Sequence, residues 1–317
     1  MPWITIKSTQ LDFFGGEKVK SYRKYIEPER EIGWEEKALK TVSFGGGVQS
    51  MALMVLAAKK IIPYKIFLFS NVGDDSEHPS TLKYLNEYAI PYAKNNDLEL
   101  IILNKTGKYK SLLDKMQRLE SSLPIPVRMN GNAAPVSRSC TYDFKIAVIA
   151  AWLKKNGCTK SIPAITALGI SKDEIGRARP TSGIDHQTLT YPLLDLRLTR
   201  DNCKKIIADA GIPVPPKSSC YFCPYHSPAE WRRMRQEEPE LFARSADLED
   251  LLNERRKKLY NPSTKSIGKD PVWLSGALKP LRESFLPMVV ENWEQDSIEF
   301  ESELSCSPFV CSSGVKI

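Results

Sequence analysis

The fold is decided by residues 41–56, which read TVSFGGGVQSMALMVL. This pattern predicts a strand end, a glycine turn and a helix start. Three consecutive glycines, Gly45 to Gly47, let the backbone adopt conformations that a Cβ forbids, and they bring several N–H groups close to a ligand. Ser50 follows near the expected helix start, where unpaired N–H groups and the helix dipole favour an anion. The stretch is therefore a candidate phosphate-binding loop, with an ordinary glycine turn as the alternative. Neither Gly-Lys-Ser/Thr nor Gly-x-Gly-x-x-Gly occurs at this loop.

Short apolar runs alternate with helical segments after this loop. Residues 65–70, 98–103 and 164–170 are continuous apolar runs, typical of strands buried in a parallel sheet. Helices are expected between and after them, at about 50–60, 79–95, 109–120, 145–156 and 201–210. The alternation predicts an α/β fold with a mostly parallel, doubly wound sheet.

The chain divides by composition into three parts. Residues 1–38 form an N-terminal extension, residues 39–227 carry the glycine loop and the sheet, and residues 228–317 form a helical, basic C-terminal region. A chain of 317 residues with 42% hydrophobic content can bury a sizeable core. Its net charge of +7 permits a polyanionic partner without requiring one.

Neither end of the chain carries a membrane signal. The N-terminus lacks the pattern of a signal peptide, and no apolar stretch approaches the roughly 20 residues that cross a bilayer. We therefore expect a cytoplasmic protein with no membrane contact. Seven cysteines in a reducing compartment point to metal, cluster or catalytic use.

Polar residues follow two of the predicted strands at the edge where open α/β sheets bind ligands. Asn71, Asp74 and Asp75 come after the second strand and could hold a ribose, an adenine amino group or magnesium. Capping of the next helix by Asp75 is the alternative. Charged residues follow the fourth strand in the same way, namely Lys172, Arg177 and Arg179.

Four cysteines are candidate metal ligands. Cys220 and Cys223 have the spacing with which a loop grips one metal or one face of a cluster, and Cys140 and Cys203 could complete the site. A [4Fe–4S] cluster suits four thiolates, and Zn2+ could use the same four or exchange one for His226. A redox-active dithiol is a third interpretation. Burial as ordinary apolar residues would explain Cys158 and Cys203, whereas Cys306 and Cys311 remain unassigned.

With these motifs, the chain resembles the PP-loop ATP pyrophosphatases, in particular their phosphoadenosine phosphosulfate (PAPS) reductase-like branch. The family loop Ser-x-Ser-Gly-Gly-x-Asp-Ser falls on residues 43–50, where Gly45 replaces a serine and Gln49 replaces the aspartate. Residues 169–174, with the arginines after them, resemble the family's Gly-x-Arg-x-x-Glu segment without its first arginine. The order of Pro-Leu, Thr-x-x-Asp, Gly-x-Pro and Cys-x-x-Cys motifs between residues 191 and 223 matches this branch.

The resemblance implies an adenine nucleotide alpha hydrolase-like fold that binds ATP and Mg2+. The nucleotide-binding residues would be Ser43, Phe44, Gly45, Gly46, Gly47, Gln49, Ser50, Asn71, Asp74 and Gly169. Catalysis by stabilising the leaving pyrophosphate would involve Ser50, Lys172, Arg177 and Arg179. Cluster-bearing members of the wider group suggest the four-cysteine site of Cys140, Cys203, Cys220 and Cys223.

The expected function is ATP-dependent sulfur modification of a nucleic acid, by thiolation of tRNA or phosphorothioation of DNA. Adenylation would release pyrophosphate, and a cysteine desulfurase could supply the sulfur. Phosphates of the nucleic acid would meet Arg232, Arg233, Arg235 and the basic run 255–258. A PAPS or APS reductase is the alternative, although the tail has Ser-Cys306-Ser and Val-Cys311-Ser in place of the usual Glu-Cys-Gly. A catalytically inactive regulatory module is the alternative of another class, because Gln49 replaces the aspartate. The oligomeric state is open, with a dimer as one expectation.

Overall fold

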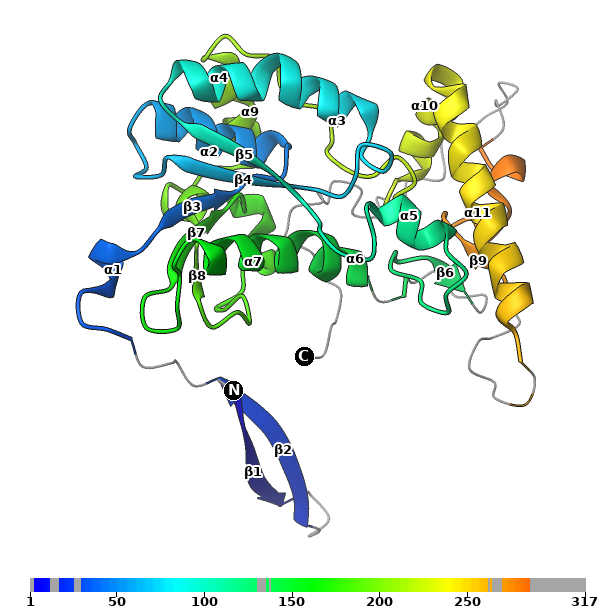
Figure 1. The fold of residues 1–317 in the computed structure, drawn as a ribbon, viewed down its shortest axis with the longest axis horizontal. Helices are drawn as coiled ribbons and strands as arrows, with labels where there is room; N and C mark the ends of the chain where they lie inside the picture. The colour runs from blue at the N-terminus through cyan, green and yellow to red at the C-terminus, as the bar shows by residue number, and fades with distance from the viewer. Residues whose placement is uncertain are drawn as a thin grey trace.

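The computed structural model describes residues 3–11, 17–25, 30–129, 135–136, 138–261, 263 and 270–285, with side chains from residue 30 onward. A parallel five-stranded sheet forms the centre of the fold (Figure 1). Its strands are β3 (Lys40–Ser43), β4 (Ile66–Asn71), β5 (Glu99–Asn104), β7 (Ala164–Leu168) and β8 (Gln187–Thr190). They lie in the order β5-β4-β3-β7-β8, and every neighbouring pair is parallel. The predicted α/β class with a parallel sheet is confirmed.

Helices cover both faces of this sheet. On one face lie α2 (Val48–Ala58), α9 (Arg200–Ala208) and the helical run α3 (Pro79–Tyr84), η1 (Leu85–Ala89) and α4 (Ile90–Asn95). On the other face lies α7 (Ala147–Lys155), as Figure 1 shows. The chain is therefore doubly wound.

Side-chain alternation along β4 feeds the cores on the two faces. Phe67 and Phe69 belong to the core around α2, whereas Leu68 belongs to the core around α7. Successive side chains of a strand point to opposite faces, so a continuous apolar run is the pattern that fits a strand covered on both sides. Helix α2 is buried along almost its whole length, from Val48 to Ala57, because it lies against the sheet and packs on α9.

The C-terminal region has a separate core. The predicted helix over 228–259 is two helices, α10 (Pro228–Glu237) and α11 (Pro239–Leu259), and each begins with a proline at its first position. They pack with α5 (Leu112–Gln117), β6 (Arg128–Met129), β9 (Val272–Trp273) and η4 (Leu281–Glu283) around Trp231. Figure 1 shows this group beside the sheet rather than on either of its faces.

The remaining elements are short connections. They are α1 (Trp34–Lys37), α6 (Ser139–Thr141), η2 (Tyr142–Ile146), η3 (Lys172–Arg177) and α8 (Pro192–Asp195). In the N-terminal extension, β1 (Trp3–Leu11) and β2 (Glu17–Tyr25) form an antiparallel hairpin. The boundaries at 38 and 227 stay predictions.

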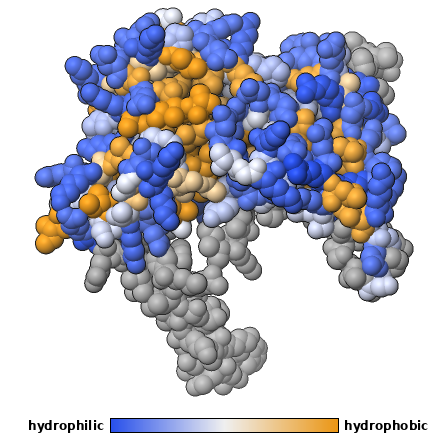
Figure 2. Space-filling view, viewed as in Figure 1, coloured by the Kyte–Doolittle hydropathy of each residue, from blue (hydrophilic) through white to orange (hydrophobic). Residues whose placement is uncertain are grey.

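One edge of the sheet is only partly covered. Strand β5 ends the sheet on one side, and its residues 100–102 are half-buried. Figure 2 shows hydrophobic residues gathered over this part of the molecule on the viewed face. In the described part of the chain, no helix has both the length and the apolar character needed to cross a membrane.

Candidate functional site

The candidate site lies where the winding of the sheet reverses. From β3 the chain moves to β4 and β5 on one side, and it later returns to place β7 and β8 on the other side. Ligands of open α/β folds bind beyond the carboxyl ends of the strands at such a switch point. The glycine loop follows β3, and residues 169–171 follow β7, so these two segments border the switch point.

The glycine loop is closely packed and leaves several N–H groups available. Gly46 has φ of 75°, and a Cβ there would lie 3.3 Å from Thr81 Cγ2. The first backbone bond of α2 runs from Met51 N–H to Gly47 C=O. Within the described residues, the bonds that fix this loop do not use the N–H groups of Gly45, Gly46 or Gly47. The loop can thus offer several donors to an anion.

Two buried hydroxyl groups next to the loop support a polar ligand there. The Ser43 and Thr81 side chains are 0% and 1% exposed, and neither hydroxyl has a hydrogen-bond partner among the described residues. A buried polar group without a partner costs free energy, so such groups call for a missing ligand or water.

Two residues assigned to this loop from the sequence are engaged in the fold itself. Phe44 is fully buried and packs edge-on against Phe67 and Phe69. Ser50 donates its hydroxyl to Gly47 C=O at 2.9 Å. Phe44 could therefore contact a nucleotide only through its backbone, and Ser50 would have to exchange an existing bond for a ligand.

Gln49 stands at the centre of a polar network. Its Nε2 donates to Glu174 Oε2 at 3.1 Å, and its Oε1 accepts from Arg200 at 3.0 Å. Glu174 also pairs with Arg177 at 2.6 Å. Burial raises the pKa of Glu174, and the two arginines oppose this effect. The network fixes the start of α2 to η3 and to the first turn of α9.

The charged residues after β7 differ in accessibility. Lys172 and Arg179 are exposed, whereas Arg177 is buried in its pair with Glu174. Gly169 is closely packed, since a Cβ there would lie 3.1 Å from backbone atoms of Gln49 and Ser50. Lys172 and Arg179 can therefore reach a ligand at the edge, while Arg177 acts through the network.

The acidic residues after β4 divide in the same way. Asn71 donates to Asp74 at 2.7 Å and accepts from the Gly73 N–H at 2.9 Å. Both oxygens of Asp75 accept hydroxyl groups, from Ser76 and Ser111, each at 2.8 Å. Asp74 is therefore the better candidate for magnesium, and Asp75 stabilises the turn. The next helix is capped by His78, not by Asp75.

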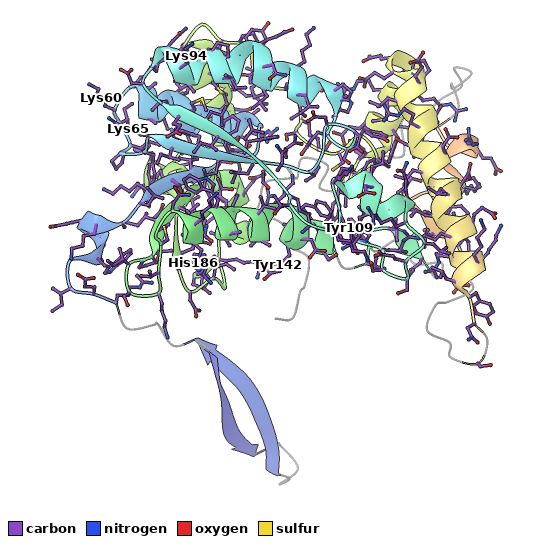
Figure 3. All side chains as sticks on the ribbon, in the orientation of Figure 1. Lys60, Lys65, Lys94, Tyr109, Tyr142 and His186 are labelled. Carbon is purple, nitrogen blue, oxygen red and sulfur yellow. The ribbon has the colours of Figure 1, made fainter. Side chains whose placement is uncertain are left out.

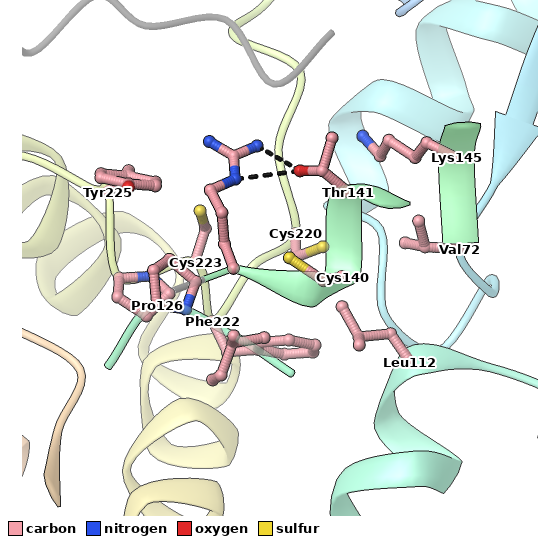
Figure 4. Close-up of a pocket in the computed structure, with 13 residues that line it drawn as sticks. Val72, Leu112, Pro126, Cys140, Thr141, Lys145, Cys220, Phe222, Cys223 and Tyr225 are labelled. Atoms are coloured by element: carbon pink, nitrogen blue, oxygen red, sulfur yellow. Dashed lines mark hydrogen bonds between the residues drawn. The ribbon is translucent and has the colours of Figure 1, made fainter. Parts of the chain in front are cut away.

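Three of the four candidate cysteines line one pocket. Cys140, Cys220 and Cys223 surround it with Arg138 and Lys145 (Figure 4). Arg138 donates to Thr141 Oγ1 and stacks over the Tyr225 ring. Two nearby cations suit a site that gathers thiolates.

Cys203 does not join this pocket. It lies on α9, fully buried in the core around α2, and burial raises the pKa of its thiol to about 12. The four-cysteine site is therefore not assembled. Across the described residues, no group of three or more His, Cys, Asp or Glu side chains stands at metal-binding spacing, so the three pocket thiols would have to draw together on a metal. Cys306 and Cys311 lie outside the described residues.

His226 also lies away from the cysteine sulfurs. Its Nε2 contacts the Cys220 and Tyr221 carbonyl oxygens at 3.0 and 3.2 Å, and its Nδ1 faces Glu230. The exchange of a cysteine for His226 in a zinc site has no support in this geometry.

The cysteine loop is attached directly to the glycine loop. Ser218 donates its hydroxyl to Gly45 C=O at 2.5 Å, and Ser219 C=O accepts the His78 N–H at 3.0 Å. Cys220 forms a bridge with Glu77, in the segment after β4. The candidate phosphate loop and the cysteine pocket are therefore parts of one connected structure.

Sequence reasoning missed several residues that build this site. Ser218 and Arg200 connect its parts, and Arg138 and Lys145 add charge beside the sulfurs. The position of Arg200 at a helix start, directly after the threonine of a capping motif, was a usable signal. The contacts of Ser218 and Lys145 depend on long-range packing and had no such signal.

The expected basic surface is smaller than the sequence indicates. Arg255 is 4% exposed and donates to the carbonyl oxygens of Met116, Arg118 and Ser122 at 2.6–2.9 Å. Arg235 bonds the carbonyl oxygens of Arg282 and Ser284. Arg255 was wrongly assigned to phosphate contact, because its guanidinium holds the segment after α5. Arg233, Lys257 and Lys258 are exposed.

Comparisons with protein-family models, with curated proteins and with solved structures each gave no match to this chain.

Proposed function

We propose that this chain is an ATP-dependent sulfur-modification enzyme of the PP-loop type, with an adenine nucleotide alpha hydrolase-like fold, acting on tRNA or DNA. The observation that carries the proposal is the bond from Ser218 to Gly45, which joins the glycine loop to a pocket lined by three cysteines. The sheet order, with its switch point between β3 and β7, supports nucleotide binding at the same edge.

The residues at the switch point have complementary tasks in this proposal. The loop N–H groups bind ATP phosphates, and Lys172 and Arg179 neutralise charge on the departing pyrophosphate. Asp74, whose carboxylate is exposed, would hold Mg2+, which neutralises phosphate charge. Arg177 positions Glu174, and Glu174 positions Gln49 at the helix start.

The cysteine pocket fits a group with three thiolate ligands better than one with four. Cys140, Cys220 and Cys223 would hold a [4Fe–4S] cluster, which when bound would supply an iron position that can carry sulfur. Arg138 and Lys145 offset the negative charge of the thiolates. A zinc ion with the same three cysteines is the alternative occupant.

The nucleic-acid substrate is supported by charge alone. The chain carries a net +7, and the exposed cations Arg233, Lys257 and Lys258 lie on α10 and α11. These side chains would bind phosphates, and a cysteine desulfurase would supply sulfur. We keep the cytoplasm as the proposed location.

One observation favours a second candidate, a nucleotide-binding regulatory module. Gln49 occupies the position of the family aspartate, and its amide is engaged by both Glu174 and Arg200. Such a module binds ATP and releases no pyrophosphate. A PAPS or APS reductase remains the other alternative, and it requires a thiol donor and no nucleic acid.

Anaerobic purification separates these functions. The proposal predicts bound iron, and pyrophosphate release from ATP that increases with tRNA or DNA. One equivalent of zinc with no iron would exclude the cluster, and equal release with and without polymer would contradict the nucleic-acid substrate. As a matched pair, Cys223→Ser should lose the iron, whereas Cys158→Ser, in the core around α7, should keep it.

A further inference from the structure

A second pocket lies on the other side of the segment that carries Ser218. It has a volume of about 330 Å³, including space open to solvent, and it is lined by residues of three elements, among them His78, Lys217, Ser219, His226 and Arg233. Ser218 faces Gly45, whereas its neighbours Lys217 and Ser219 line this pocket. The pocket is therefore distinct from the glycine loop.

His226 presents an unsatisfied acceptor in this pocket. Its Nε2 lies 3.0 Å from Cys220 C=O and 3.2 Å from Tyr221 C=O. Carbonyl oxygens only accept, so Nε2 carries the proton and Nδ1 has a lone pair. The residue is 8% exposed, and Nδ1 has no hydrogen-bond partner among the described residues. A ligand that satisfies Nδ1 must bring a proton.

The neighbour of this nitrogen cannot supply that proton. Glu230 Oε2 lies 3.8 Å from Nδ1, beyond hydrogen-bond distance, and it already accepts from Lys217 and from the Ser227 N–H, each at 2.7 Å. A carboxylate is itself only an acceptor. Two acceptors thus face each other across a gap that a protonated ligand can fill.

The positive charge at the pocket comes from Arg233. Lys217 is paired with Glu230, whereas the exposed Arg233 forms no ion pair with any described residue. Its guanidinium offers several donors in the geometry that phosphate oxygens accept.

We propose that this pocket is a second anion site, which binds an inorganic phosphate that keeps a proton, either orthophosphate or pyrophosphate. The P–OH group donates to His226 Nδ1, and the other oxygens accept from Arg233. Sulfate and carboxylates have no proton to donate at pH 8 and fit poorly. The proposal does not depend on ATP turnover, because phosphate binding here needs no reaction at the glycine loop.

Histidine NMR reads this pocket directly, because the chain has three histidines and two of them line it. His186 bonds Ala150 C=O instead, and Figure 3 shows it beside α7, away from α10. Full-length protein with labelled histidine is titrated at pH 8 with orthophosphate, pyrophosphate and sulfate. His186→Gln assigns the third signal.

Phosphate or pyrophosphate should shift the signals of His226 and His78 and leave that of His186 unchanged, and the tighter of the two identifies the natural anion. Arg233→Gln should raise the half-saturating concentration about tenfold, the effect of losing one charged hydrogen bond. Arg232→Gln, one position away and outside the pocket, should not. An equal response to sulfate, no response to either phosphate, or an unchanged titration in Arg233→Gln would overturn the proposal.

Discussion

Ser218 donates its hydroxyl to the carbonyl oxygen of Gly45 at 2.5 Å, across 173 residues of sequence. The acceptor is the first glycine of the loop at the switch point, and the donor lies two residues before Cys220. The bond therefore fixes the cysteine loop against the glycine loop. It also directs the Gly45 carbonyl toward Ser218, so that the carbonyl does not oppose an anion at the loop.

Removal of this bond should weaken nucleotide binding more than folding. We expect Ser218→Ala to lower ATP affinity about fivefold, because one neutral hydrogen bond contributes about 1 kcal/mol. Isothermal titration calorimetry measures this change. Ser219→Ala is the matched control, since the Ser219 hydroxyl makes no contact with the loop, and it should bind ATP as the wild type does. Equal affinities for both variants would show that the bond does not organise the loop.

The contact between Gly169 and the start of α2 gives a second test. A Cβ at Gly169 would lie 3.1 Å from Gln49 and Ser50 backbone atoms, so Gly169→Ala must displace the helix start. Overpacking of this kind costs about 1–3 kcal/mol. We expect a lower melting temperature and at least tenfold weaker ATP binding. Gly176→Ala, where a Cβ meets nothing within 4 Å, should change neither property.

Most of the central sheet could be predicted from the sequence, because strands buried on both faces are continuous apolar runs. Strands β4, β5 and β7 lie within two residues of the runs at 65–70, 98–103 and 164–170. Strand β8 was not predicted. Its sequence, QTLT, has one strongly apolar residue, and the strand ends the sheet with a single neighbour. Pairing with β7 defines it, and that is a long-range property.

Arg255 should be essential for stability. Its guanidinium is buried on three carbonyl oxygens, and Arg255→Gln leaves at least two of them without a donor. We expect a loss of about 2–4 kcal/mol in the free energy of unfolding, measured with urea. The exposed Lys258 is the control on the same helix, and Lys258→Gln should stay within about 0.5 kcal/mol of the wild type. A stable Arg255→Gln variant would contradict the structural role.

The errors in the candidate site come from helix faces. Arg255 lies one helical repeat after Leu248 and Leu252, both buried, so periodicity could have placed it on the inner face of α11. Cys203 is different, because the sequence order of four cysteines gives no information on which core each one enters. Its burial against α2 follows from the packing of α9 on that helix.

Glu249 should make stability depend on pH. Burial raises the pKa of this carboxyl to about 7, although the N–H groups of Leu274 and Leu281 each bond it at 2.7 Å. A carboxyl with a raised folded pKa contributes most below its unfolded value of 4.5, and this contribution is lost as pH rises through about 7. Relative to Glu249→Gln, the wild type should therefore lose roughly 1–3 kcal/mol between pH 4.5 and 8. Urea unfolding of both proteins across this range measures the difference, and a constant difference would contradict the assignment.

The products of ATP turnover test the central claim most directly. The anaerobically purified protein is incubated with ATP and with tRNA or DNA, and the nucleotide products are separated and identified. A glycine loop that supports adenylation next to the cysteine pocket predicts AMP and pyrophosphate, formed faster with one of the two polymers. ADP and orthophosphate, or bound ATP that stays intact with both polymers, would contradict it.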